Sequence, residues 1–468
     1  MIIRKLNIKI LILLLSVIIV SGYFLISLII GNDKFNNLKS LLNNEKKQSI
    51  IKYIIPYRLI SQQEKTISKQ KQIINKLKNF NWASIELYEK DEVSDIIIKE
   101  SNIELSNNLT LKKFELNSGF YAGINNHFPG SGYIDFFKDN IVILSSRGIL
   151  AFRKNLTDDE ENFRQIKNNI NDFIDIGQYN KSRTFSLKDL LIFNKKIFVS
   201  YTEEIKEDCW NTSIIYGDMN YESIKFTKLL SPKECVHSFK NLDKNFNAHS
   251  SGGRIQGFDN NHILLSVGEY LERYLAQNKE SINGKIIKIN IDNNDYEVIS
   301  MGHRNPQGLY FDKENNFILE TEHGPQGGDE INLIELNIAN KDKIQNYGWA
   351  ISSAGEHYGG KNEDSKKKYE KYPLYNSHSE HGFIEPLKSF VPSIGISEII
   401  KIKLNKYVVS SLRDKSLYFF ELNKQREIIN LNRVEVFERV RDLKIKDNIL
   451  YLFMEDTASI GVININKY

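Results

Sequence analysis

A unit of two short apolar strands joined by a polar turn recurs along the chain, and it restricts the fold more than any other feature. Each unit has strands rich in Ile, Val, Leu and Phe around a turn of Asp, Asn or Lys. The six copies are Tyr133 to Ser146, Leu187 to Tyr201, Arg254 to Val267, Gly308 to Thr321, Glu398 to Ser411 and Arg441 to Phe453. Such strand pairs, without helical periodicity, are typical of radially repeated four-stranded sheets. We therefore predict an all-β fold, a six-bladed β-propeller, with a pair of β-sandwiches as the alternative.

The segment before these repeats has a different composition. Ile10 to Ile30 is an almost unbroken apolar run without charge. At ~1.5 Å per residue, a helix of this length crosses a ~30 Å hydrocarbon layer. Arg4, Lys5 and Lys9 precede the run, so the positive-inside tendency keeps the N-terminus in the cytoplasm. We favour an uncleaved transmembrane anchor over a cleaved signal peptide, because the run is long for a signal peptide.

These features divide the chain into three predicted parts. Residues 1–31 form the cytoplasmic tip and anchor, residues 32–80 a helical stalk or linker, and residues 81–468 the propeller. Pro56 interrupts the stalk, because a helix interior tolerates proline poorly. We expect a single-pass protein of a bacterial inner membrane whose propeller lies in the periplasm.

Charge and cysteine content restrict the partners. The chain has 63 Lys plus Arg against 59 Asp plus Glu, scattered without a basic stripe, so we exclude nucleic acid. The two cysteines, Cys209 and Cys235, are too few for a metal site. They form either one disulfide outside the cytoplasm or two buried thiols.

The strands are flanked by unusual polar, glycine-rich segments. They read GHRNPQGL at residues 302–309, EHGPQGGDEIN at 322–332 and NYGW at 346–349. In this order they resemble the signature of soluble quinoprotein glucose and aldose sugar dehydrogenases, the glucose/sorbosone dehydrogenase family. The resemblance covers most of the chain from about Phe120. It implies oxidation of the anomeric carbon of an aldose to a lactone by hydride transfer to pyrroloquinoline quinone (PQQ). The reduced cofactor would pass electrons to a respiratory quinone or cytochrome.

The resemblance also names candidate catalytic residues. The segment NAHSSGGRI, residues 247–255, is similar to the block carrying the family's catalytic histidine, which makes His249 the candidate general base. Glu269, in SVGE, would orient that imidazole, and Arg304 would stabilise the oxyanion developing on the quinone. The chain departs from the family here: Ala248 replaces an acidic residue, and Arg254 follows His249 by five residues instead of four.

PQQ is a planar tricarboxylate, so its site needs several cationic donors. The resemblance offers Arg413, in SSLRDK, with Arg439 and Arg441, in ERVRD. Arginines two residues apart on a strand point to the same side, which suits a clamp on carboxylates. Further cofactor contacts implied by the family are Asn305, Gln307 and Thr457.

The family also implies calcium, an ion that prefers oxygen ligands. One Ca²⁺ would bind the main-chain carbonyls of Gly324 and Pro325 together with the quinone, and would polarise its carbonyl as a Lewis acid. A second, structural Ca²⁺ would use Glu330 and Tyr347, although the insertion from Asn337 to Gln345 changes the loop between them.

Two other functions fit a propeller. A calcium-dependent hydrolase, similar to a lactonase, also uses a histidine in a central pocket, but it does not need three converging arginines. A non-catalytic sugar-binding propeller explains the fold and the anchor, but it leaves His249 and Glu269 without a role.

Overall fold

The computed structural model describes residues 97–116, 131–146, 148–154, 163–174, 187–337 and 344–466, with a few isolated residues elsewhere. The chain divides into two units, residues 1–79 and 80–468, and the second contains the sheets. The predicted anchor and stalk lie outside the described residues, apart from Ser21, Gln63 and residues 66–70. In the part of the chain that is described, no helix is long and apolar enough to cross a membrane.

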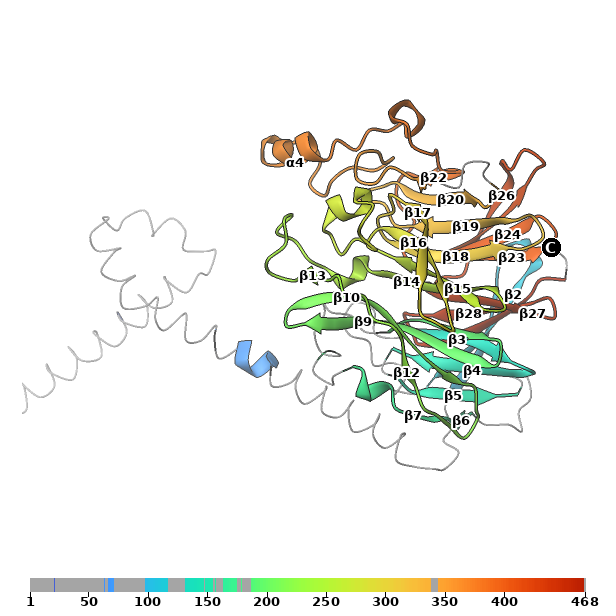
Figure 1. Ribbon diagram of the computed structural model, residues 1–468. Helices are drawn as coiled ribbons and strands as arrows, with labels where there is room; N and C mark the ends of the chain where they lie inside the picture. Colours follow the sequence, from blue (N-terminus) through green and yellow to red (C-terminus); the bar gives the residue numbers. More distant parts are fainter. Residues whose placement is uncertain are drawn as a thin grey trace, which may run out of the picture. The chain divides into compact units, whose positions relative to one another are not determined.

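The described strands form six sheets of four or five strands, antiparallel except that β21 pairs parallel with β17 (Figure 1). The first two contain β3 (Gly132–Phe137), β4 (Asn140–Ser145), β5 (Leu150–Arg153) and β6 (Arg164–Gln165), then β8 (Leu187–Phe193), β9 (Lys196–Lys206), β10 (Cys209–Asp218), β12 (Thr227–Leu230) and β13 (Val236–His237). The next two contain β14 (Gly252–Asp259), β15 (His262–Val267), β16 (Lys285–Asn290), β17 (Tyr296–Met301) and β21 (Gln345–Asn346), then β18 (Pro306–Asp312), β19 (Phe317–Glu322), β20 (Asp329–Glu335) and β22 (Lys388–Phe390). The last two contain β23 (Ile396–Lys403), β24 (Lys406–Ser411), β25 (Ser416–Leu422) and β26 (Ile428–Glu435), then β27 (Val440–Lys446), β28 (Ile449–Met454), β29 (Ser459–Asn464), β2 (Thr110–Leu116) and β1 (Ile97–Glu104). Outside them lie the parallel pair β7 (Lys167–Asn168) and β11 (Ser223–Ile224) and the short helix α4 (Lys366–Lys371).

The first strands of the six sheets form a closed ring. They contact one another in the cyclic order β3, β8, β14, β18, β23, β27 and back to β3. Each predicted strand pair is the first two strands of one sheet, such as β3 with β4 and β27 with β28. The predicted six-bladed propeller is therefore confirmed, and the sandwich alternative is wrong.

Apolar side chains between the sheets hold the ring together. Alternate residues of a strand face opposite sides of its sheet, so each sheet can pack against both of its neighbours. Each contact between neighbouring sheets has its own cluster of buried apolar residues. At the contact between the last sheet and the first, for example, Phe453 and Ile460 pack with Ile134 and Ile143.

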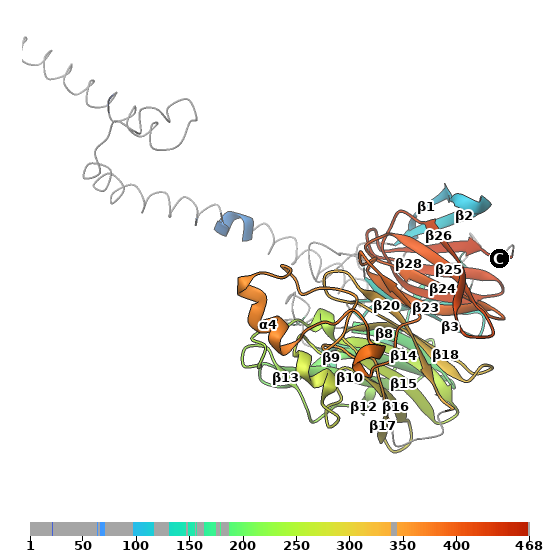
Figure 2. The same cartoon turned by 90° about the horizontal axis from the view of Figure 1, so that it is seen from above.

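The last sheet is completed by strands from the other end of the domain. β2 pairs antiparallel with β29. β1 pairs with β2, and both strands are seen in Figure 2. The six-unit pattern did not predict this pairing.

Cys209 and Cys235 form a disulfide, so the alternative of one disulfide is confirmed over that of two buried thiols. It joins the start of β10 to the residue before β13.

Candidate functional site

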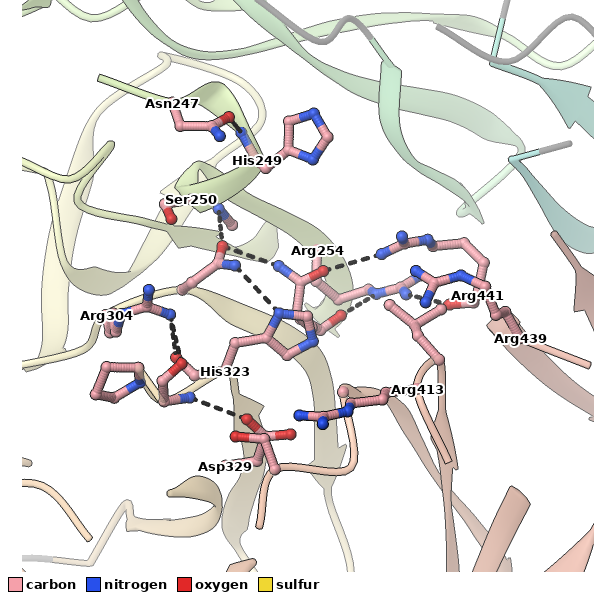
Figure 3. Close-up of a pocket in the computed structure, with 18 of the residues that line it drawn as sticks. Asn247, His249, Ser250, Arg254, Arg304, His323, Asp329, Arg413, Arg439 and Arg441 are labelled. Atoms are coloured by element: carbon pink, nitrogen blue, oxygen red, sulfur yellow. Dashed lines mark hydrogen bonds between the residues drawn. The ribbon is translucent and has the colours of Figure 1, made fainter. Parts of the chain in front are cut away.

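A cavity of about 400 Å³ lies at one end of the ring, where the first strands of the sheets begin (Figure 3). The starts of these strands contribute Tyr133, Lys188, Arg254, Gln307 and Arg441. Loops that follow outer strands bring further side chains to the same end. Propeller loops that converge on the central channel are where functional groups from different blades meet.

The cavity gathers residues from each predicted group: His249, Arg304, Asn305, Gln307, Gly324, Pro325, Arg413, Arg439 and Arg441. The other predicted residues, Glu269, Glu330, Tyr347 and Thr457, do not line it. Residues that the sequence patterns did not single out complete the lining, chiefly Lys188, His323, Asp329 and Glu455.

His249 lies on a short 3₁₀ turn, Ala248–Ser250. Asn247 begins this turn, as asparagine commonly does at a helix start. Its side-chain Oδ1 accepts the N–H of His249 at 2.9 Å, and its carbonyl accepts the N–H of Ser250 at 3.0 Å. The main chain on both sides of the candidate base is therefore fixed by local hydrogen bonds.

The extra residue between His249 and Arg254 is absorbed by two glycines. Gly252 and Gly253 have φ of 62° and 113°, in the region that favours glycine. The pairing of β14 with β15 shifts register between Gly252 and Ile255, which is the mark of a β-bulge. As a result, both the histidine and the arginine still line the cavity.

Glu269 does not orient His249 in this structure, contrary to prediction. Its Oε1 accepts the N–H of Leu271 at 3.1 Å, and its Oε2 is buried without a hydrogen-bond partner. Burial raises the pKa of Glu269 to about 7, although Arg273 and Arg304 favour the charged form. The carboxyl group is thus bound within the turn after β15, and the backbone N–H of Glu269 donates to the carbonyl of Arg304 at 3.0 Å.

Arg304 lies against the glycine-rich loop that follows β19. Its Nη1 donates to the carbonyls of His323 at 2.8 Å and Gly324 at 2.7 Å, and its guanidinium lies 5.3 Å from the ring centre of Trp349. Gly324 was predicted to ligate calcium. A carbonyl oxygen carries two lone pairs, so it has capacity for one partner beside the arginine.

His323 is a second histidine of the cavity, but protein groups occupy both of its ring nitrogens. Nε2 lies 2.5 Å from the carbonyl of Ile396 and must donate, because a carbonyl only accepts. Nδ1 lies 3.5 Å from the side-chain nitrogen of Asn305. Burial lowers the pKa of His323, with Arg441 and Arg304 acting in the same direction. His323 is thus a neutral, fixed ring, which leaves His249 as the better candidate base.

A chain of hydrogen bonds joins three of the predicted cofactor residues, Arg441, Gln307 and Asn305. Arg441 Nη1 donates to Gln307 Oε1 at 3.0 Å, and Gln307 Nε2 donates to Asn305 Oδ1 at 2.9 Å. The same oxygen of Asn305 accepts the N–H of Gly252 at 3.2 Å. The bulge after the His249 turn is therefore connected to Arg441, which lines the cavity together with Arg413 and Arg439; we call these three residues the arginine wall.

Glu455 bridges the two predicted clamp arginines. Its carboxylate accepts from Arg439 Nε at 3.0 Å and from Arg441 Nε at 2.6 Å. Burial opposes ionisation, but Arg441 and Arg439 outweigh it and lower the pKa of Glu455 to about 2. Because the carboxylate takes the Nε side of each guanidinium, the pair is held side by side at the cavity.

Thr457 was predicted to contact the cofactor, but it lies outside the cavity. Its hydroxyl donates to Glu438 at 2.8 Å and lies 2.6 Å from the hydroxyl of Ser459. The turn between β28 and β29 directs Glu455 inward instead, two residues earlier in the same EDTA string.

Arg413 differs from the other arginines of the wall. Within the described part of the chain, its guanidinium has no hydrogen bond or ion pair with another side chain, and it lines the cavity. Together with Arg304, Arg439 and Arg441 it presents positive charge that Asp329 and Glu455 only partly balance. Unbalanced cations facing a cavity of this size suit a ligand with several carboxylates, so these residues fit PQQ.

Glu330 and Tyr347 meet at a second, small cavity of about 10 Å³ behind the Gly324 loop. Burial and the neighbouring Glu322 raise the pKa of Glu330 well above its usual range. The hydroxyl of Ser352, which lines the same cavity, is buried without a partner. A buried carboxylate beside an unsatisfied hydroxyl fits a hard cation, although the hydroxyl of Tyr347 is taken by the carbonyl of Leu333 at 2.6 Å.

The floor of the main cavity is an ion cluster around Arg254. Its Nη1 lies 2.7 Å from Asp189, 2.8 Å from Glu398 and 2.9 Å from Asp442, and all four side chains are buried. Burial disfavours the charge on the guanidinium, but the three carboxylates outweigh it and raise the pKa of Arg254.

The same guanidinium reaches the remaining sheets. Its Nε donates to the carbonyl of Gln307 on β18 at 2.9 Å, and its carbon lies 5.9 Å from the ring centre of Tyr133 on β3. With its three carboxylate partners on β8, β23 and β27, Arg254 of β14 contacts all five of the other first strands.

Comparisons with known proteins identify the family of the chain. The family model described as glucose / sorbosone dehydrogenase matches residues 192–462. Aldose sugar dehydrogenase YliI of Escherichia coli is 24% identical over 288 residues, which span 57% of this chain and 71% of that protein. An uncharacterized protein of Synechocystis, slr1608, is 30% identical over 223 residues, 41% of this chain and half of that protein.

Two solved structures share the fold. The apo-form of the soluble aldose sugar dehydrogenase from Escherichia coli superposes with a TM-score of 0.55 at 20% identity, covering 71% of this chain and 95% of that one. The PQQ-bound form of aldose sugar dehydrogenase from Streptomyces coelicolor superposes with a TM-score of 0.50 at 16% identity, covering 72% and 99%.

Proposed function

Because the chain belongs to the glucose/sorbosone dehydrogenase family, we propose that it is a PQQ-dependent dehydrogenase that oxidises aldose sugars at the anomeric carbon. The substrate loses its anomeric hydrogen as hydride and its hydroxyl proton to a base, and the product is the lactone. The observation that carries the proposal is the convergence of His249 and the arginine wall on one cavity.

The cation set favours this reaction over the two alternatives. A hydrolase similar to a lactonase has no need for Arg413, Arg439 and Arg441 at one cavity, and a sugar is uncharged. A non-catalytic propeller has no need for an imidazole beside them. A planar tricarboxylate accounts for both the number and the sign of these charges.

When bound, the quinone supplies the hydride acceptor. Arg439, Arg441 and Arg413 hold its carboxylates, while Asn305 and Gln307 offer amide groups at the same wall. Arg304 lies beside the Gly324 loop and would stabilise negative charge that develops on the acceptor oxygen. His249 takes the hydroxyl proton of the sugar as general base.

We also propose that the protein binds Ca²⁺ at these two cavities. The carbonyls of Gly324 and Pro325 at the cavity wall, and Glu330 with Tyr347 at the small cavity, offer the oxygen ligands that Ca²⁺ prefers.

Location and partners are proposed from the sequence. Residues 1–31 would anchor the protein in a bacterial inner membrane with the propeller in the periplasm, where a respiratory quinone or cytochrome accepts its electrons. We expect that deletion of residues 2–31 yields a protein that stays in the soluble fraction, because the sheets begin only at Ile97. Its dye reduction per loaded site should equal that of the full chain. A deletion variant that does not fold would contradict this division.

The proposed base is tested by His249→Gln, which keeps size and some hydrogen bonding but removes the basic nitrogen. Loss of a positioned general base typically costs ~10² to 10⁴ in rate. The variant is loaded with PQQ and Ca²⁺, occupancy is measured by absorbance, and cofactor reduction by aldose is followed in a single turnover. We expect normal loading and slow reduction. Reduction at the wild-type rate would remove His249 as the base, and the lack of any reduction by aldoses in the wild-type protein would refute the proposed function.

A further inference from the structure

Lys188 enters the cavity from β8 and reaches the loop that carries His249. Its Nζ donates to the carbonyl of Ala248, the residue before the histidine, at 2.7 Å. The stem of the lysine crosses the bulge on its way, because a Cβ added to Gly253 would lie only 2.4 Å from Lys188 Cβ. A side chain larger than hydrogen at Gly253 would therefore displace the lysine.

The surroundings of Lys188 disfavour a charged ammonium group. Burial lowers its pKa well below the usual range, and the charge of Arg441 acts in the same direction. An apolar residue at the same position of β8 would avoid this cost, since its neighbours Leu187 and Leu190 are fully buried. The bond to the Ala248 carbonyl offsets part of this cost.

The bond from Lys188 reaches the His249 loop at a place where the predicted contact from Glu269 does not form. Glu269 makes no hydrogen bond to His249, and the loop is longer by the residue absorbed at Gly252 and Gly253. The turn has its own bonds at Asn247, but these lie within the loop. Lys188 ties the loop to a different sheet of the ring.

We propose that Lys188 is a positioning residue for His249, holding the turn Ala248–Ser250 against β8 so that the imidazole keeps its place at the cavity. The role of the histidine rests on the proposed function, but the anchoring of the loop does not. A displacement of about 1 Å in a reacting group can cost up to ~10²-fold in rate, so loss of this bond should be measurable.

The first experiment is hydrogen exchange on the full-length protein without cofactor. In Lys188→Met, which keeps length but removes the ammonium, we expect faster exchange in peptides that contain His249 and Ser250, because their N–H groups bond to Asn247. Lys446→Met is the matched control, since Lys446 also donates to a main-chain carbonyl, that of Lys138. Unchanged exchange in the loop of Lys188→Met would overturn the anchoring.

The second experiment asks whether the amine itself is needed. The only two cysteines of the chain form the disulfide, so Lys188→Cys introduces a single free thiol. Alkylation with 2-bromoethylamine restores a lysine analogue, whereas a propyl group restores only the length. With the cofactor fully loaded, we expect single-turnover reduction by aldose to fall ~10- to 100-fold in Lys188→Cys and in its propyl form. The aminoethyl form should regain most of the rate.

Equal rates in the propyl and aminoethyl forms would refute a positioning role for the ammonium. If the wild-type protein oxidises no aldose, the proposed function fails, whereas the loop exchange still decides whether Lys188 anchors the turn.

Discussion

At the floor of the cavity Arg254 meets three buried carboxylates, whereas on the wall Arg413 has no side-chain partner within the described residues. Arg439 and Arg441 lie between these extremes, because one carboxylate, Glu455, serves both. Arginine side chains thus have two different roles in one cavity. Where the charge is fully balanced the arginine joins the blades, and where it is not balanced the arginine is available to a ligand.

The largest expected effect comes from removing the charge at the floor. Arg254→Met leaves Asp189, Glu398 and Asp442 buried without the guanidinium that contacts all three, although Lys444 still favours their charged forms. Breaking a buried ion pair typically costs ~3 to 5 kcal/mol. Arg413→Met breaks no ion pair and should change the free energy of unfolding by no more than ~0.5 kcal/mol. Urea unfolding measures both. If Arg254→Met does not fold, Arg254→Lys, which keeps one donor, should give a smaller loss. Equal changes in the free energy of unfolding for Arg254→Met and Arg413→Met would show that the floor and the wall do not differ in this way.

A second prediction compares the pH response of the two regions. On the wall, Glu455 has its pKa lowered from 4.5 to about 2, so its contribution is present above pH 4.5 and is lost as the pH falls towards 2. The shift corresponds to about 3 kcal/mol. At the floor, burial raises the pKa of Glu398 from 4.5 to about 8, although Arg254 opposes it. Its contribution is present below pH 4.5 and is lost as the pH rises through 8.

The measurement is the free energy of unfolding of the wild type minus that of each Gln variant, as a function of pH. For Glu455→Gln we expect the difference to shrink between pH 5 and pH 2. For Glu398→Gln we expect it to shrink between pH 5 and pH 9. Parallel curves for the two variants would show that the carboxylates do not differ in this way.

The third prediction concerns the wall alone and sharpens its role. Arg439→Ala or Arg441→Ala should weaken PQQ binding by ~10- to 100-fold, because a hydrogen bond to a charged group contributes ~1.5 to 3 kcal/mol. Turnover of the fully loaded enzyme should change far less, since these bonds act in ground and transition states alike. Arg433→Ala is the matched control: Arg433 pairs with Asp414 at 2.6 Å and does not line the cavity. Unchanged cofactor titration in both variants would remove the pair from the site.

The six strand pairs could be predicted because strand alternation and turn residues are local. Which strand completes a sheet is not local, so the pairing of β2 with β29 left no pattern in either segment. The same limit applies within the site. The motifs drew attention to His249, Arg304 and the arginine pair, all of which line the cavity, but the reach of Lys188 depends on how β8 lies beside the bulge. The sequence did contain one signal for Lys188: it is a charged residue at the second position of an otherwise largely apolar strand, LKDLL. The prediction that Thr457 contacts the cofactor did not take into account the turn between β28 and β29, which directs its hydroxyl to Glu438 and Ser459.

The pairing of β2 with β29 also has a consequence for how the protein is made. The residues of β2 leave the ribosome before any of the six repeated strand pairs, yet their hydrogen-bonding partner β29 is synthesised only after all six. Until then, the nascent chain exposes an unpaired strand edge at Thr110–Leu116 and apolar faces on its first and last sheets. Such edges favour aggregation and cleavage, so a chain truncated before β27 would hold five blades and could not close the ring. Closure of the ring therefore depends on β29 as much as on β3.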